Sequence, residues 1–419
     1  MWRKATAACL VLAPIALTVS TAVDPALGTV EEYGVYRAHP DATQWHSLLL
    51  HWAWALFVPG FLGLLAPVRR RGVVLAIFAW VATVVGLVTF GALMSADFAL
   101  LSLEQQSGVT DAQLAAWDDR MADQTWAVLG WQQLGILGWG LALMLTPIAA
   151  ARARVINWWT AGLALAGTVL YLLFAISPLP LCILGPVTLV VAYTMAARQV
   201  LGFRAAGDEP GVFGRFRRRA GQMCMIAAPL SFAVGMATVP PGSPEPDSIL
   251  KHPDLGQASA FFLHLAWVLF IPAVLTLAAP GRRVTRIASG LTVLGLINFS
   301  GLMFGDYLDL AARQSLGNTI ADQAAETQGG YLTFSLGWVL PGMLLALLGL
   351  IVVATSAAVD RVVRWWVPAL VGAGLAAFFL LGLGPIGVIG PLLLLGGFGA
   401  AAVTLRTPAA TEVSAVPVG

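Results

Sequence analysis

The stretch HWAWALFVP, residues 51–59, returns as HLAWVLFIP at residues 264–272. Nine residues separate each copy from a preceding His-Pro-Asp triplet, which lies at 39–41 in one case and at 252–254 in the other. Four of the five histidines therefore belong to two copies of one pattern. The chain is predicted to contain an internal duplication, and its few polar side chains stand out against apolar surroundings.

The composition indicates which solvent the chain folds in. Of its 419 residues, 58% are hydrophobic and only 11% are charged. A water-soluble domain cannot cover that much apolar surface, so the predicted solvent is a lipid bilayer. The net charge of +2 does not point to nucleic acid. The three cysteines, Cys9, Cys182 and Cys224, all lie in apolar runs, which favours small core residues over a disulfide framework or a thiolate metal site.

Twelve apolar segments follow one another, most of them long enough to cross about 30 Å of hydrocarbon as a helix. Their approximate ranges are 5–23, 46–67, 73–96, 125–149, 158–176, 180–197, 220–239, 258–279, 286–305, 331–355, 365–383 and 386–404. The predicted fold class is an all-α integral membrane protein with about 12 transmembrane helices in two parallel six-helix repeats. The number falls to ten if the Pro- and Gly-broken pairs, 158–197 and 365–404, do not fully span.

The distribution of charge predicts the orientation. With the N-terminus inside, 19 of the 23 basic residues fall on the cytoplasmic side, which is the positive-inside pattern. The outer side keeps only Arg37, Arg120, Lys251 and Arg313. Both termini are then cytoplasmic. Basic residues are almost all arginine, and with abundant Ala, Gly and Val this suggests GC-rich coding, hence a bacterial inner (plasma) membrane.

Matching motifs extend the duplication along both halves. Residues 86–98 (GLVTFGALMSADF) correspond to 295–307 (GLINFSGLMFGDY), Gly138-Trp139 is matched with Gly337-Trp338, and RVINWW from Arg154 with RVVRWW from Arg361. The predicted organisation is a first six-helix repeat at 1–200, a cytoplasmic linker at 201–217, a second repeat at 218–406 and a disordered cytoplasmic tail at 407–419. Six segments per unit make the repeats parallel, related by an axis along the membrane normal.

The repeated polar residues are the candidate site. On this layout His51 lies about five residues into its helix, roughly 8 Å below the outer interface, and Asp97 ends the next helix on the same side. Imidazole and carboxylate groups suit zinc or a similar divalent metal, so two outer metal sites are predicted. Their candidate ligands are His39, Asp41, His51 and Asp97 in one half, and His252, Asp254, His264 and Asp306 in the other.

Several alternatives to metal binding stay open. His-Pro-Asp also suits a helix start, and a His beside a carboxylate can simply lock two helices together. Haem ligation needs His51 and His264 to face one another across a shared cavity. His46 has Ser259 as its counterpart, so it is predicted to be an unpaired interface residue. Thr110 and Gln113 predict a capping box that starts a short outer helix.

Ser47, His51 and Asp97 together resemble the pattern of the ceramidase and progestin-receptor-type membrane hydrolases. In that superfamily such residues help to hold a catalytic zinc, so the resemblance implies a zinc site at the outer face. The chain departs from the family by lacking a late HxxxH pair and by having twelve segments instead of seven. The spacing of Ser259 and His264 also differs from that of Ser47 and His51.

The functional expectation follows from these features. Acids and bases are missing near the middle of the segments, where the main polar residues are Thr89, Gln132, Gln133, Tyr193, Thr194, Asn298 and Ser300. Two six-helix halves suit a transporter or permease that handles a hydrophobic small molecule or lipid. The alternatives are a membrane-embedded enzyme that binds metal or haem at its outer face, and a structural or accessory membrane protein.

Overall fold

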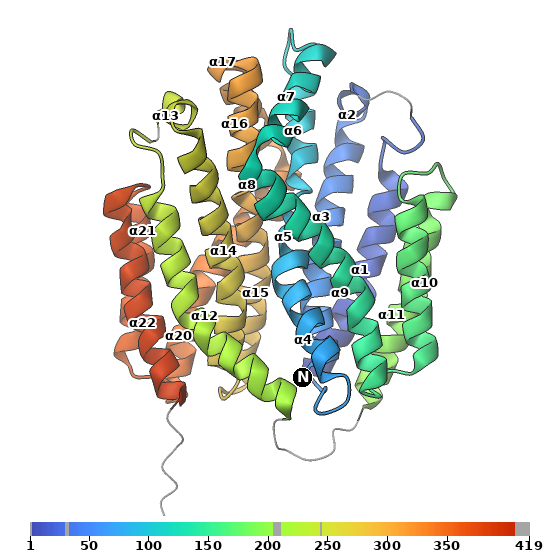
Figure 1. Ribbon diagram of the computed structural model, residues 1–419, viewed down its shortest axis with the longest axis vertical. Coiled ribbons are helices and arrows are strands. Elements are labelled where there is room, and N and C mark those ends of the chain that lie inside the picture. Colours follow the sequence, from blue (N-terminus) through green and yellow to red (C-terminus); the bar gives the residue numbers. More distant parts are fainter. Residues whose placement is uncertain (1, 30–32, 204–210, 244, 407–419) are drawn as a thin grey trace, which may run out of the picture.

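The computed structural model describes residues 2–29, 33–203, 211–243 and 245–406. The middle of the predicted linker, 204–210, and the predicted tail, 407–419, lie outside the described residues. No strand occurs in the described part of the chain, which is helical almost throughout. Figure 1 shows the helices standing roughly side by side along the long axis, with residues 1–203, here the first half, beside residues 211–406, the second half.

Within the described ranges, ten helices are long and apolar enough to cross a membrane, which is the fold of a polytopic membrane protein. They are Trp2–Val23, Pro40–Leu65, Val73–Glu104, Thr125–Arg152, Leu181–Gly202, Val212–Ala237, Pro253–Ala278, Arg283–Leu316, Leu332–Val359 and Pro385–Leu405. The two remaining predicted segments are shorter apolar helices, α10 (Trp158–Phe174) and α21 (Trp366–Leu381). At 1.5 Å per residue these two are about 25 Å long, a little less than the hydrocarbon thickness.

The first half is built from α1 (Trp2–Val23), α3 (Pro40–Leu65), α4 (Val73–Val81), η1 (Ala82–Leu87), α5 (Val88–Ala92), α6 (Ser95–Glu104), α8 (Thr125–Ala127), η2 (Val128–Gln133), α9 (Leu134–Arg152), α10, η3 (Leu181–Ile183) and α11 (Leu184–Gly202). Helix α1 packs on α3 and α11, and α10 packs on α11 as a hairpin. The segment η1 packs on α9.

The second half is built from α12 (Val212–Ala237), α14 (Pro253–Ala278), α15 (Arg283–Leu302), α16 (Gly305–Leu316), α18 (Leu332–Phe334), η4 (Ser335–Val339), α19 (Leu340–Met343), η5 (Leu344–Leu348), α20 (Gly349–Val359), α21, η6 (Pro385–Val388) and α22 (Ile389–Arg406). Helix α12 packs on α14 and α22, and α21 packs on α22. The segment η5 packs on α15.

Four short helices cap one end of the molecule, α2 (Val35–Ala38), α7 (Asp111–Asp123), α13 (Pro246–Lys251) and α17 (Asn318–Gly330). We call this end the α7 end and the opposite one the linker end. The predicted capping box is confirmed at the start of α7, where Gln113 Oε1 accepts from the main-chain N–H and the hydroxyl of Thr110. Trp117 of α7 is buried and donates to the carbonyl oxygen of Leu308, so α7 is fixed against α16 of the other half.

The two halves meet along a central seam formed by α5 against α15, α14 against η1, and α3 against α15 and α18. The segments η1, η2, η4 and η5 are π-helical, and short π-helical stretches occur frequently at functional sites. Three of them, η1, η2 and η4, belong to helices that bring side chains to the histidines of the seam. The polar residues at this seam are therefore candidates for the functional site.

Candidate functional site

The His-Pro-Asp triplets begin the two helices that carry the buried histidines. His39 is the N-cap of α3, Pro40 is its first residue, and Asp41 lies in the first turn. Residues 252–254 repeat this arrangement at the start of α14. Proline suits the first helical position, and an acid in the first turn interacts favourably with the helix dipole. The four titratable side chains are exposed: His39, Asp41, His252 and Asp254.

His51 and His264 lie farther from the starts of their helices than the sequence predicted. Helix α3 begins at Pro40 and not near residue 46, so His51 is the twelfth of its 26 residues. His264 occupies the same position in α14, which begins at Pro253. At 1.5 Å per residue each histidine lies about 16 Å from the start of its helix. Both belong near the middle of the membrane-spanning helices, away from the exposed triplets.

His51 is almost completely buried, with 1% of its surface exposed, and it contacts both halves. Its Nδ1 atom lies 2.9 Å from the carbonyl oxygen of Gly91 in α5, within the same half. Its Nε2 atom lies 3.0 Å from Oδ1 of Asn298 in α15, across the seam. Trp338 of η4, also from the second half, stacks on the imidazole with a centroid distance of 3.5 Å and an interplanar angle of 19°.

His264 makes the corresponding contacts in the opposite direction. Its Nδ1 atom lies 3.1 Å from the carbonyl oxygen of Ser300 in α15, within its own half. Its Nε2 atom lies 2.9 Å from the hydroxyl oxygen of Thr89 in α5, across the seam. Trp131 of η2 stacks on its ring at 3.9 Å and 30°. Each histidine is thus held between one helix of its own half and two segments of the other.

The stacking tryptophans are tied to the same residues that face the histidines. Nε1 of Trp338 donates to the carbonyl oxygen of Asn298, and Nε1 of Trp131 donates to the carbonyl oxygen of Thr89, both at 3.0 Å. Trp131 thus makes the same kinds of contact as Trp338. Trp139, which the sequence matched with Trp338, instead stacks on Phe90 at 4.7 Å.

A second polar cluster lies toward the α7 end of the first half, and it is centred on His46. The His46 Nδ1 atom lies 3.0 Å from the carbonyl oxygen of Ser20, and Nε2 lies 3.7 Å from a carboxylate oxygen of Asp24 and 3.9 Å from one of Asp97. Ser47 donates to Asp97 at 2.9 Å. The prediction that His46 is an unpaired interface residue is therefore wrong.

This cluster also affects a tyrosine outside the spanning helices. The negative charge of Asp97 raises the pKa of Tyr36 in α2, with burial and the charges of Asp24 and Glu104 acting in the same direction. The phenol therefore stays protonated over the ordinary range of pH. Glu104 itself is buried and accepts bonds from the main-chain N–H groups of Gly34 and Arg37, each at 2.7 Å, which fixes α2 over the end of α6.

The eight predicted metal ligands are thus distributed over different places. Asp97 contacts His46 and Ser47, the partners of His51 are Gly91 and Asn298, and Asp306 is exposed in the first turn of α16. Among the described residues, no group of three or more His, Cys, Asp or Glu side chains could hold a metal ion. Binding of metal or haem by the predicted residues stays a prediction.

An aromatic cluster holds several buried polar atoms without partners. In the first half, Trp54 packs edge-on against Trp139 with ring centroids 5.7 Å apart, and Phe57 packs on Tyr193 at 5.3 Å. Stacking of Trp54 on Phe57, at 5.8 Å, joins these pairs into one cluster. Trp54 Nε1, Trp139 Nε1 and the Tyr193 hydroxyl are buried and have no hydrogen-bond partner in the described structure.

The corresponding residue of the second half, Trp267, also has a buried and unpartnered Nε1. It lies among phenylalanines, with Phe299 at 4.8 Å and Phe232 at 4.9 Å. An unpaired donor at membrane depth is costly, because no water is present in hydrocarbon to replace the missing acceptor. The aromatic clusters are therefore candidate contact sites for a molecule that brings an acceptor.

No protein-family model, no curated protein and no solved structure matches this chain. The features that bear on function are the polar seam, the His46 cluster and the aromatic donors.

Proposed function

We propose that this protein is a transporter or permease that handles a hydrophobic small molecule or lipid carrying an oxygen acceptor. The observation that carries the proposal is the set of unpaired donors in the first aromatic cluster, Trp54 Nε1, Trp139 Nε1 and Tyr193 OH. Aromatic rings supply apolar contact, and a few placed polar groups give orientation, which is the usual composition of a small-molecule site. A ligand carbonyl, ester or phosphate oxygen would satisfy these donors.

The arrangement of the halves supports the same proposal. We infer that the chain consists of two parallel six-helix repeats, because His51 and His264 make corresponding contacts in reciprocal directions. Arg154 and Arg361 support this inference, since both have a positive φ, 60° and 59°, at the end of a helix. Parallel repeats with a site near their interface are a common plan of secondary transporters, which is a likeness at the level of the fold.

Binding is tested first, with protein purified in a mild detergent. Molecules extracted from the wild type and from a W54F/W139F/Y193F variant are compared by mass spectrometry, with Trp159→Phe as the control because Trp159 is 86% exposed. We expect one hydrophobic species to be enriched over bulk lipid in the wild type and the control, and depleted in the triple variant. No enrichment in any sample would reject the binding step and favour an accessory role.

Transport is tested with a disulfide bond that joins the two halves across the seam. A Cβ built on Gly301 in α15 lies 3.5 Å from the Cβ of Ala92 in α5, within the range of disulfides. An A92C/G301C variant, in a background lacking Cys9, Cys182 and Cys224, should cross-link the halves on oxidation. We expect proteoliposomes to move the enriched species, oxidation to stop the flux and reductant to restore it. Flux that is indifferent to the cross-link would contradict movement at the seam.

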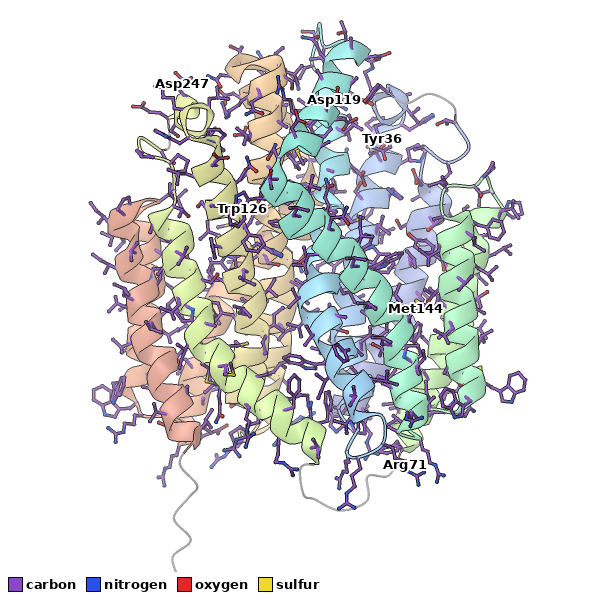
Figure 2. The ribbon with its side chains drawn as sticks, viewed as in Figure 1. Tyr36, Arg71, Asp119, Trp126, Met144 and Asp247 are labelled. Carbon is purple, nitrogen blue, oxygen red and sulfur yellow. The ribbon has the colours of Figure 1, made fainter. Side chains whose placement is uncertain are left out.

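The proposed location is the bacterial inner membrane, with both termini in the cytoplasm and the α7 end outside. Figure 2 shows Asp119 near one end of the molecule and Arg71 at the other. In the same cysteine-free background, a membrane-impermeant maleimide should label Asp119→Cys in intact cells. Arg71→Cys should react only after the membrane is opened. The reverse pattern would invert the proposed topology.

A further inference from the structure

A neutral His51 ring has fewer N–H groups than the acceptors that face it. Nδ1 faces the carbonyl oxygen of Gly91, which can only accept. Nε2 faces Oδ1 of Asn298, and the orientation of that amide is set by its Nδ2 group, which donates to the carbonyl oxygen of Leu294 at 2.8 Å. Turning the amide over would place two oxygens against each other. Both ring nitrogens therefore face acceptors, and a neutral imidazole has only one N–H to offer.

A neutral His264 ring has the same shortage of N–H groups, although different residues surround it. Nδ1 faces the carbonyl oxygen of Ser300. Nε2 faces the hydroxyl oxygen of Thr89, which also lies 2.6 Å from the carbonyl oxygen of Val85, so one hydroxyl proton has to serve two contacts. Asn298 and Thr89 thus do the same thing with unlike side chains: each donates to the carbonyl four residues earlier and presents an oxygen to a histidine of the other half.

We propose that His51 and His264 are proton-binding sites in the interior of the membrane, and that the described conformation is the one in which both rings are doubly protonated. An imidazolium has two N–H groups in the plane of the ring, which matches the two oxygens at each site. Hydrogen bonds made by the charged form favour that form over the neutral one. The proton, once bound, would be shared across the seam between the two halves.

The ring faces support a cation as well. Trp338 stacks on His51 and Trp131 on His264, and the indole face is the best aromatic partner for a cation. Each indole N–H is fixed to the main chain of Asn298 or Thr89, so the stacking geometry and the in-plane acceptors are positioned by the same residues. These interactions act against the loss of hydration that burial imposes on a charge.

The charged and titratable groups on the surrounding elements are few. The residues of α5, α15, η2 and η4 that hydrogen-bond to the two histidines or stack on them are uncharged. The carboxylate of Asp97 is held one turn closer to the α7 end, where Ser47 of α3 donates to it, and His46 lies beside it. On the side of His264, Asp306 is exposed in the first turn of α16 and the buried Tyr307 donates to the carbonyl oxygen of Gln257. The charge is therefore held by dipoles and an aromatic face.

Protonation is read directly by ¹⁵N NMR of histidine-labelled protein in lipid, because a protonated and a bare ring nitrogen have well-separated shifts. Signals are assigned by their loss in His51→Gln and His264→Gln. The exposed His39 and His252 are internal controls. We expect both nitrogens of His51 and of His264 to carry protons at about pH 6. A neutral tautomer of either ring at that pH would overturn the proposal.

A matched pair of variants tests the acceptor that carries the argument. Thr89→Val replaces the hydroxyl by a methyl group of similar size, and Thr89→Ser retains it. We expect His264 to become a neutral tautomer protonated at Nδ1 in Thr89→Val and to stay doubly protonated in Thr89→Ser. An unchanged His264 spectrum in a folded Thr89→Val protein would contradict the role of Thr89. If that variant does not fold, the wild-type spectrum still decides.

The inference stands apart from the proposed transport. Doubly protonated rings in a protein that neither binds nor moves a hydrophobic molecule would uphold the proton sites and reject the transporter. Flux through a protein whose buried histidines are neutral would do the reverse. If both hold, the flux should respond to a pH gradient, and the response should weaken in Thr89→Val but not in Thr89→Ser.

Discussion

Gly86 of η1 and Gly138 of α9 pack backbone against backbone, and neither position has room for a Cβ atom. The contact brings the third and fourth spanning helices of the first half as close as two helices can come. Small residues at such crossings are the usual means of packing helices in lipid, where the hydrophobic effect between helices is absent.

Alanine at either glycine should therefore destabilise the protein. We expect Gly86→Ala and Gly138→Ala each to cost about 1–3 kcal/mol through overpacking, measured as a lower Tm in detergent. Gly140→Ala is the matched control, because a Cβ there meets nothing within 4 Å. Equal Tm values for Gly138→Ala and Gly140→Ala would show that the helices separate without cost.

The His46 cluster predicts a difference between two histidines on one helix. His46→Ala removes a ring that bonds to Ser20 and lies within 4 Å of two carboxylates, which should cost about 1–3 kcal/mol. His39→Ala should change the stability by less than about 0.5 kcal/mol, because His39 is exposed and its side chain makes no capping bond. Thermal unfolding of both variants checks the contrast, which fails if His39→Ala is the more damaging change.

The indole N–H groups at the seam predict the effect of a conservative change. Trp131→Phe or Trp338→Phe keeps a ring over the histidine and removes the bond to the carbonyl oxygen of Thr89 or Asn298. We expect a loss of about 1–3 kcal/mol in each case, because both sites are buried and the abandoned carbonyl has no water. Trp159→Phe, at an exposed position, should leave the Tm unchanged. Thermal unfolding of the three variants checks this. An equal loss of Tm in Trp159→Phe would show that the effect does not depend on the buried indole hydrogen bonds.

Asp360 lies in the turn after α20, at the linker end, and it should make the stability of the protein depend on pH. Its pKa is lowered from the ordinary value of 3.8 by bonds from the N–H of Arg282 and the hydroxyl of Thr285. A depressed pKa means that the carboxylate stabilises the fold above that ordinary value, and that this contribution is lost as the pH falls through the folded-state pKa. The Tm of the wild type should exceed that of Asp360→Asn at neutral pH. The difference in Tm should disappear at acid pH. A difference that does not change with pH would refute the role of the Asp360 carboxylate.

Much of the fold could be predicted from hydropathy, because long apolar runs bounded by charge require helices in a bilayer. The residues at which the helices begin were harder to predict. Helix α3 begins six residues before its predicted apolar run, since His39, Pro40 and Asp41 form a helix start made of polar residues. The π-helical segments leave no mark in composition, because they depend on packing against the neighbouring helices.

The candidate site was predicted only in part. Burial of His51 and His264 followed from their place in apolar helices, but their partners across the seam did not, because Asn298 and Thr89 are chemically unlike. The register of the fourth helix was ambiguous because Gly-Trp occurs at both 130–131 and 138–139. His46 was missed for a related reason, since Ser259 at its counterpart position gave no sign that the residue was paired.

The reciprocal contacts at the seam also bear on how the chain is made. The ribosome delivers the first half before Asn298 and Trp338 exist, so His51 enters the bilayer without two of its partners. Polar groups left unsatisfied in hydrocarbon cost several kcal/mol each, and the half-made protein should be a target for membrane proteases. A first half expressed alone should therefore be degraded, and a second half supplied as a separate chain should protect it. Completion of the seam would then act as a checkpoint that is passed only when both halves are present.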